Sequence, residues 1–140
     1  MVAYSFKGRF EAPLRDGLKR TTIRKVGKKR HARPGERMTF TTADRFHPRL
    51  IGEARCADVQ AITINFERTT PGGRRLHAHI IIGTAEAREV IRTPLLDAFA
   101  RRDGFADWAD MVAFWRETHG PIESFEGLCI RWTDFKPVAP

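Results

Sequence analysis

Two side chains close together in the first quarter of the chain, Lys19 and Thr22, could carry out chemistry. A lysine that is removed from water and lies near other cations has a pKa below its usual value of about 10.4, because both effects disfavour the ammonium. We expect Arg20 and Arg24 to act on Lys19 in this way. The neutral amine could then accept a proton from Thr22 or from water, which would activate a weak nucleophile.

Such a pair would suit the cleavage of an amide, with Arg24 or backbone N–H groups stabilising the oxyanion. Both side chains also have ordinary roles that the sequence leaves open. A lysine in a basic segment often contacts phosphate or lies in solvent, and a threonine often bonds to nearby backbone. Residues three apart lie on opposite faces of a straight strand. Lys19 and Thr22 can therefore cooperate only where the chain bends or coils just after Gly17.

Short strands and late helices are predicted around this segment. Apolar periodicity and turn residues indicate the following elements: a strand over residues 2–6, a short helix over 11–16 ended by Gly17, strands over 37–42 and from Leu50, a hairpin of 61–66 with 76–82, helices opened by Thr93-Pro94 and capped by Asp107, and a strand over 128–135. Five or six strands with inserted helices predict an α+β fold. We expect a small mixed β-barrel with helices packed at its side and rim, in one domain over residues 1–140.

The segment Gly17-Leu18-Lys19-Arg20-Thr21-Thr22-Ile23-Arg24 follows a strand and precedes a Pro-Gly turn into the next one. In this context it resembles the GxKxxExR signature of the ASCH family. Gly17, Lys19 and Arg24 match the signature, and Thr22 stands where the signature has Glu. The resemblance covers most of the chain and implies a PUA-like β-barrel associated with RNA.

A threonine at this position is similar to the bacterial ASCH amidohydrolases that act on N(4)-acetylcytidine. In that subgroup a Lys and a Thr of this motif work with an acidic residue just before a later helix. Asp103 stands at the matching place, where the subgroup has Glu. The resemblance thus implies a catalytic set of Lys19, Thr22 and Asp103. Position alone allows another role for Asp103, a surface ion pair with Arg101 or Arg102.

The positive charge is concentrated in one segment. The chain has a formal net charge of +8, and residues 15–33 hold nine basic residues against the single acid Asp16, so the rest of the chain is neutral. A basic block on a neutral body favours a polyanionic partner over a loop that is basic for solubility alone. The residues expected to contact RNA or substrate are Phe6, Gly17, Arg20, Arg24, Lys25, Lys28, Lys29, Arg30 and Arg33. Phe6 could stack on a nucleobase or simply belong to the core.

Several classes of site are excluded by the residue types present. No apolar stretch approaches the roughly 20 residues of a membrane span, and the N-terminus lacks a signal-peptide core, so we expect no membrane partner. The two cysteines, Cys56 and Cys129, form no CxxC motif and are expected to be reduced in a cytoplasmic protein. His77 and His79 lack a third ligand nearby, so we expect no metal and no cofactor.

Three functions remain from the sequence. The first is an ASCH-type domain that binds RNA, a nucleobase or a nucleoside in a cleft beneath the basic loop. The second is an amidohydrolase that deacylates N(4)-acetylcytidine or a related amide. The third is a regulatory module without catalytic activity. Salt dependence separates the first from the third, and incubation with N(4)-acetylcytidine tests the second.

Overall fold

A computed structural model describes residues 1–139 of the 140-residue chain. Its elements follow in this order: β1 (Val2–Phe6), the 3-10 helix η1 (Gly8–Phe10), α1 (Glu11–Arg15), β2 (Thr21–Arg24), β3 (Arg37–Thr42), β4 (Leu50–Asn65), β5 (Arg68–Thr69), β6 (Arg75–Leu76), β7 (His79–Gly83), β8 (Arg88–Ile91), α2 (Leu95–Arg102), α3 (Trp108–His119) and β9 (Ser124–Pro137). The fold is α+β and rich in strands, as predicted.

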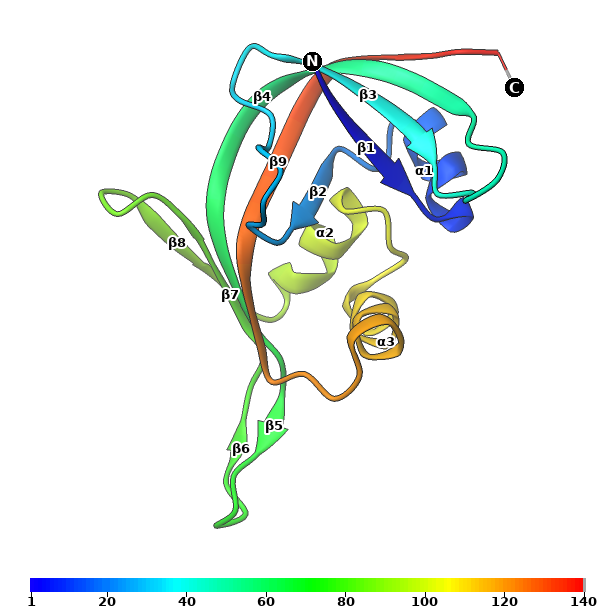
Figure 1. The fold of residues 1–140 in the computed structure, drawn as a ribbon. Helices are drawn as coiled ribbons and strands as arrows, with labels where there is room; N and C mark the ends of the chain where they lie inside the picture. The colour runs from blue at the N-terminus through cyan, green and yellow to red at the C-terminus, as the bar shows by residue number, and fades with distance from the viewer. Residues whose placement is uncertain (140) are drawn as a thin grey trace.

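The long strands β4 and β9 form the centre of a curved, seven-stranded sheet (Figure 1). β4 pairs antiparallel with β9 along its length, while its other side pairs first with β3 and then with β7. β1 extends the sheet parallel to β3, β8 follows β7, and β2 pairs with β9. Register shifts along the β4–β9 ladder mark bulges, which increase local twist and bending. This bending suits the arc that both strands describe.

The helices α2 and α3 lie on the inner side of this arc (Figure 1). The Asp107 side chain caps α3 by accepting a hydrogen bond from the backbone N–H of Asp110 at 2.8 Å, which satisfies a free donor of the first turn. The apolar side of α3 faces the core, with Met111 and Trp115 buried. Together with Ile62 and Ile64 of β4 and the buried side chains of α2, these residues belong to one continuous apolar cluster.

The two edge strands near the motif, β1 and β2, are not joined by a ladder, because β1 pairs with β3 and β2 pairs with β9. The sheet is therefore not closed into a barrel, and the predicted closure is not confirmed. A side chain spans the gap instead: Arg24 of β2 donates from Nη2 to the backbone oxygen of Ser5 in β1 at 2.9 Å. We call this gap the β1–β2 seam.

The predicted element bounds agree with the structure in most places. The strands over 2–6 and 37–42 match β1 and β3, and the predicted hairpin is formed by β4 and β7. The strand number was too low: β2 lies within the basic segment, and β5 and β6 form a separate ribbon that projects from the body (Figure 1).

The predicted cap of α2 is wrong. Thr93 does not cap this helix, since α2 begins at Leu95 after Pro94 and has no side-chain cap. A backbone bond from Leu95 N–H to the oxygen of Arg92, 2.7 Å long, closes the turn instead. Within residues 1–139, no helix has the length and apolar composition needed to cross a membrane.

Candidate functional site

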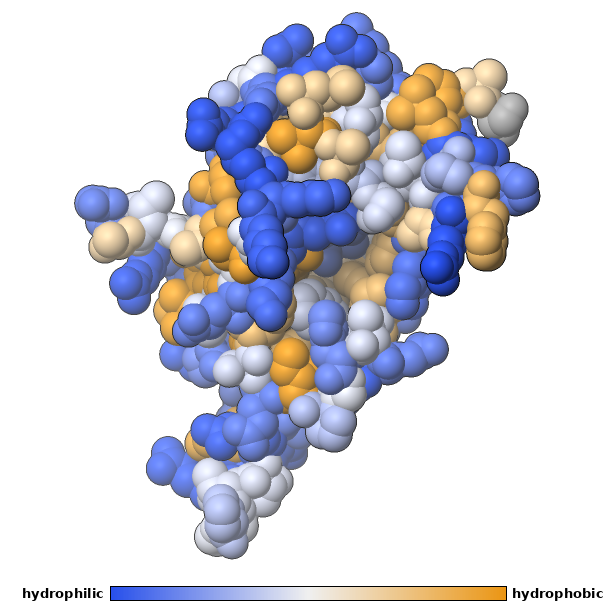
Figure 2. Space-filling view, in the orientation of Figure 1, coloured by the Kyte–Doolittle hydropathy of each residue, from blue (hydrophilic) through white to orange (hydrophobic). Residues whose placement is uncertain are grey.

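A cavity of about 630 Å³ lies beside the β1–β2 seam, bounded by these strands, the α2–α3 loop, α3 and the start of β9. Figure 2 shows a hollow near the middle of this face, with pale and orange surface surrounded by blue hydrophilic side chains. Six aromatic residues line the cavity: Phe6, Phe10, Phe105, Phe114, Trp115 and Phe125. Its ionisable lining consists of Lys7, Lys19, Arg24, Lys25, Asp103, His119 and Glu126. The cavity thus combines apolar walls with a few charged groups, as small-molecule sites do.

The side chains of Lys19 and Asp103 form a buried pair on the cavity wall and are only 3% and 6% exposed. Lys19 Nζ donates to the backbone oxygen of Asp103 at 2.5 Å and lies 3.4 Å from its carboxylate Oδ1. Two of the alternatives left open by the sequence are therefore wrong: Lys19 does not lie in solvent, and Asp103 makes no surface pair with Arg101 or Arg102. The shorter Asp, compared with the Glu of the family pattern, does reach the amine.

The segment between α1 and β2 bends so that Lys19 points inward. Gly17 adopts a left-handed φ of +77°, which glycine reaches without steric penalty, and the next two N–H groups both donate to the oxygen of Pro13. Arg20 N–H then donates to the oxygen of Arg102 at 2.7 Å, which fixes the segment against the end of α2. The bend required for Lys19 and Thr22 to line one cavity is therefore present.

Asp103 is held by the C-terminal end of α2 and by Thr21. It occupies the C-cap position, where its N–H bonds to backbone oxygens of the last helical turn. Thr21 Oγ1 donates to Asp103 Oδ1 at 3.0 Å. Sequence reasoning missed Thr21 in this role. Its position two residues after Lys19 was the available signal, because residues i and i+2 share a face when the chain is extended.

Burial acts on both members of the pair. It lowers the pKa of Lys19, an effect that the charge and hydrogen bond of Asp103 oppose and that Arg24 reinforces. Burial also raises the pKa of Asp103, although Lys19, Thr21 and Arg24 each act in the opposite direction. Burial and Arg24 thus shift Lys19 as predicted, whereas Arg20 is exposed. Both pKa values therefore move toward favouring the neutral forms.

Thr22 and Arg24 form a second polar pair on the same wall. Arg24 donates from Nε to Thr22 Oγ1 at 3.0 Å, and its guanidinium carbon lies 5.0 Å from the ring centroid of Phe6. Burial lowers the pKa of Arg24. Within residues 1–139, no hydrogen bond joins Thr22 to Lys19. Because Arg24 occupies an acceptor site of the hydroxyl, the Thr22 O–H remains able to donate into the cavity.

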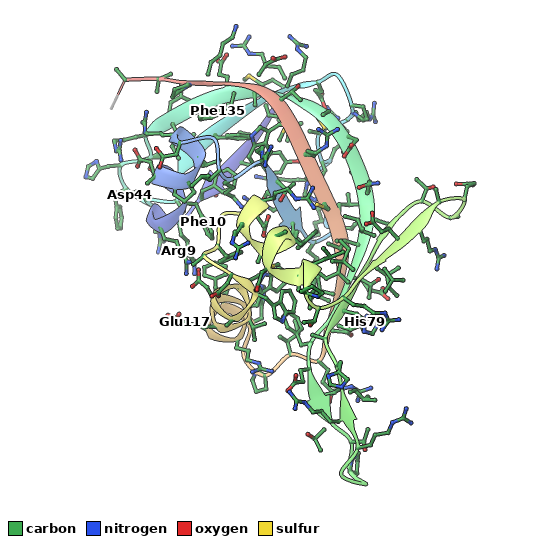
Figure 3. All side chains as sticks on the ribbon, turned by 180° about the vertical axis from the view of Figure 1, so that it is seen from behind. Arg9, Phe10, Asp44, His79, Glu117 and Phe135 are labelled. Atoms are coloured by element: carbon green, nitrogen blue, oxygen red, sulfur yellow. The ribbon has the colours of Figure 1, made fainter. Side chains whose placement is uncertain are left out.

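Aromatic rings surround the amine of Lys19. Its Nζ lies 4.7 Å from the ring centroid of Phe10 and 5.6 Å from that of Phe6, within cation–π range. Figure 3 shows Phe10 next to Arg9 on the side of the molecule that faces α3. Phe6 is 4% exposed and packs edge-to-face on Phe40, so its role is in the core and the cavity wall rather than on an open stacking surface.

Gly104 is a further residue that sequence reasoning did not connect with the site. A Cβ atom at this position would lie 2.8 Å from Lys19 Cδ and 3.2 Å from Phe10 Cδ1, and the residue has a φ of +95°. The absence of a side chain therefore lets the lysine stem pass across the α2–α3 loop.

The other predicted contact residues fall into two groups. Lys25 lines the cavity, and Arg20, Lys28, Lys29 and Arg33 are exposed outside its lining, as is Gly17. Arg30 is different, because it makes two bonds of 2.8 and 2.7 Å to the carboxylate of Glu36. The pKa of Glu36 is lowered to about 2, and the hydrogen bonds from Arg30 contribute most to this shift. The charge of Arg30 is thus already matched within the protein.

No metal ligand set is formed by the described part of the chain. Among residues 1–139, no three His, Cys, Asp or Glu side chains come together in a group that could hold a metal ion. His79 contacts Asn65, with 3.2 Å between Nε2 and Nδ2. The cavity lining offers ionisable and hydroxyl groups for chemistry without a metal, among them the Lys19–Asp103 pair, the Thr22 hydroxyl and the Arg24 guanidinium.

No family model, curated protein or solved structure matches this chain. The ASCH resemblance accordingly remains a prediction from the motif, and the cavity is the feature of the structure that bears on function.

We predict that Gly104→Ala displaces Lys19 and destabilises the protein more than Gly35→Ala does. Both glycines have positive φ, +95° at Gly104 and +87° at Gly35, so both substitutions carry a backbone penalty of roughly 1–2 kcal/mol. A Cβ at position 35 meets nothing within 4 Å, whereas one at position 104 collides with the lysine stem. Urea unfolding of the two variants measures the difference, and equal losses of stability would contradict this account of Gly104.

Proposed function

We propose that the protein is an amidohydrolase of the ASCH type, which removes an acyl group from the exocyclic nitrogen of a nucleobase such as N(4)-acetylcytidine. The observation that carries this proposal is the convergence of Lys19, Thr22 and Asp103 on one aromatic-walled cavity. A domain that only binds nucleic acid has no evident need for a buried lysine–carboxylate pair, since burying two charges is energetically unfavourable. Perturbed pKa values in a cavity are typical of catalytic acids and bases.

Lys19 is the general base in the proposed reaction. Its neutral amine takes a proton from a water molecule while the water oxygen forms a bond to the amide carbonyl carbon. The tetrahedral intermediate then collapses, the carbon–nitrogen bond breaks, and the proton passes from the Lys19 ammonium to the leaving nitrogen. The products are acetate and the nucleobase with a free exocyclic amino group. Asp103 holds the amine in place and stabilises its protonated form between the two steps.

Arg24 and Thr22 bind the reacting amide. The guanidinium of Arg24 has five N–H donors, of which Nε bonds to Thr22 and Nη2 to Ser5. Its remaining donors are assigned to the oxyanion of the intermediate, where a fixed positive charge is most useful. Thr22 donates a hydrogen bond from its hydroxyl to the attacking water or to the substrate. We therefore assign it a positioning role and not that of the nucleophile.

The proposal extends to the fold. The order of the strands around β4 and β9 supports a PUA-like arrangement, in which the curve closes between β1 and β2 through Arg24 and not through a ladder. In this arrangement Arg24, one of the signature residues of the ASCH motif, lies at the β1–β2 seam. Arg24 then has both a structural and a catalytic role.

Lys19→Ala is predicted to abolish the release of acetate from N(4)-acetylcytidine, because the cavity lining offers no other amine buried beside a carboxylate. Lys28→Ala removes an exposed lysine outside the cavity lining and should retain full activity. Thr22→Ala should lower kcat by a smaller factor than Lys19→Ala. Acetate is measured by an enzyme-coupled assay at millimolar substrate. Equal background rates in wild type and Lys19→Ala would refute the catalytic proposal.

The pH dependence of kcat should shift in opposite directions in two variants. The rate rises with pH as Lys19 loses its proton. Asp103 raises the pKa of Lys19, so Asp103→Asn should move the rise to lower pH. Arg24 lowers the same pKa, so Arg24→Gln should move the rise to higher pH. Rate profiles of folded variants, checked by circular dichroism, measure both shifts, and a shift of the same sign in both would exclude Lys19 as the base.

A second function, the binding of RNA by the basic loop between β2 and β3, is favoured by the exposed lysines of this loop. Lys25, Lys28 and Lys29 form no ion pair within residues 1–139, and Lys25 also lines the cavity. Unpaired ammonium groups on one loop suit phosphate, which they contact without reading sequence. The regulatory module remains a hypothesis that no feature of the site specifically favours.

We predict that Lys28→Ala/Lys29→Ala weakens the binding of single-stranded RNA and flattens its salt dependence. Loss of two phosphate contacts should reduce the slope of log K against log salt by roughly 1.4. Arg30→Ala should change the slope little, because Arg30 is already paired with Glu36. Fluorescence anisotropy over a range of salt concentrations measures these slopes. An unchanged slope in the double variant would show that the loop is not the contact surface.

A further inference from the structure

The charges on the cavity wall are not balanced. Of its basic side chains, Lys19 faces the carboxylate of Asp103, and Arg24 is tied to Thr22 and Ser5. Two lysines of the lining, Lys7 and Lys25, are exposed and form no ion pair within residues 1–139. The other acidic residue of the lining is Glu126, and His119 adds a second titratable group on that side. Apart from these paired groups, the lining therefore has one carboxylate, that of Glu126, and two ammonium groups without an ion-pair partner, those of Lys7 and Lys25.

The fold brings the two lysines to the same part of the cavity. Lys7 directly follows Phe6, the last residue of β1, and Lys25 directly follows Arg24, the last residue of β2. The bond from Arg24 to Ser5 ties these strand ends together across the seam. Lys7 and Lys25 thus flank the β1–β2 seam, while Lys19 lies buried farther along the same wall.

The position of Lys7 is further defined by an aromatic ring. Its Nζ lies 5.2 Å from the ring centroid of Phe114, a half-buried residue of α3 that also lines the cavity. An ammonium group over an aromatic face keeps hydrogen-bond donors free for a ligand. Sequence reasoning did not identify Lys7, because it lies outside the basic segment of residues 15–33.

We propose that the substrate is a phosphorylated nucleoside, with its base among the aromatic walls near Lys19 and its phosphate bound by Lys7 and Lys25. This inference rests on the proposed amidohydrolase function and names the substrate class of that site. A neutral nucleoside would leave both ammonium groups without a partner, whereas a phosphate accepts charge-assisted hydrogen bonds from each. The phosphate can come from a nucleotide or from an RNA backbone, since both offer the same oxygens.

Calorimetric binding of cytidine, cytidine 5′-monophosphate and a short cytidine oligonucleotide tests the inference. The wild type should bind the monophosphate roughly tenfold or more tightly than cytidine, as one charge-assisted hydrogen bond would give. Lys7→Ala/Lys25→Ala should abolish this preference. The matched control Arg74→Ala/Lys136→Ala removes the same charge at exposed positions outside both the cavity lining and the basic loop, and it should retain the preference. If the wild type prefers only the oligonucleotide over cytidine, and Lys7→Ala/Lys25→Ala loses this preference, the bound phosphate belongs to an RNA backbone and not to a free nucleotide.

Equal affinity of the wild type for all three ligands would overturn the inference, and so would an equal loss of the preference in both double variants. The same proteins are assayed for acetate release from N(4)-acetylcytidine and its 5′-monophosphate, which separates the two proposals. Turnover without a preference for phosphate would retain the amidohydrolase and reject the phosphate site. A Lys7- and Lys25-dependent preference without turnover would retain the phosphate site and reject the hydrolase.

Discussion

The burial of Lys19 against Asp103 is the interaction on which the site depends. An ammonium and a carboxylate lose their hydration when they are buried, which costs free energy. Their mutual attraction offsets this cost only if further polar groups satisfy their remaining hydrogen-bond donors and acceptors. Thr21 and the backbone oxygen of Asp103 provide that shell, and the ring of Phe10 covers the amine. Because burial shifts both pKa values toward the neutral forms, the pair is suited to accept and return a proton.

The second constraint is the open edge between β1 and β2. A hydrogen-bonded ladder between β1 and β2 would bring their backbones together and close the space beside Lys19. Instead, the Arg24 side chain connects the two strands and reaches Thr22 at the same time. The same guanidinium therefore stabilises the fold, positions a hydroxyl and brings positive charge to the cavity. The strand ends that it ties together also carry Lys7 and Lys25, which places the charge of the seam beside the reactive groups.

The sequence predicted local features well because their signals are local. The strands over 2–6 and 37–42, the short helix before Gly17 and the Asp107 cap follow from alternation, turn residues and capping chemistry. β2 was less visible, because it has only four residues and lies within a basic segment. Its strand structure depends on pairing with β9, more than a hundred residues later.

The site was predictable only where a motif pointed to it. Lys19 and Thr22 came from the motif, and Asp103 came from the family pattern. Thr21, Gly104 and Lys7 could not be assigned, because their roles arise from contacts between segments far apart in the chain. The contact of Lys19 with Asp103 spans 84 residues. The pairing of Arg30 with Glu36 spans only six residues, and it was missed because Glu36 lies just beyond the segment 15–33 over which the charge was counted.

A direct titration of Lys19 by nuclear magnetic resonance tests the central claim. Lysine Nζ and Cε signals are followed from neutral to alkaline pH, and Lys19 is assigned by its absence from the spectrum of Lys19→Ala. We expect Lys19 to titrate below the usual lysine value of about 10.4, because burial disfavours its ammonium form. Titration of Lys19 at or above this value would contradict the account, because a fully protonated amine at neutral pH cannot act as the base.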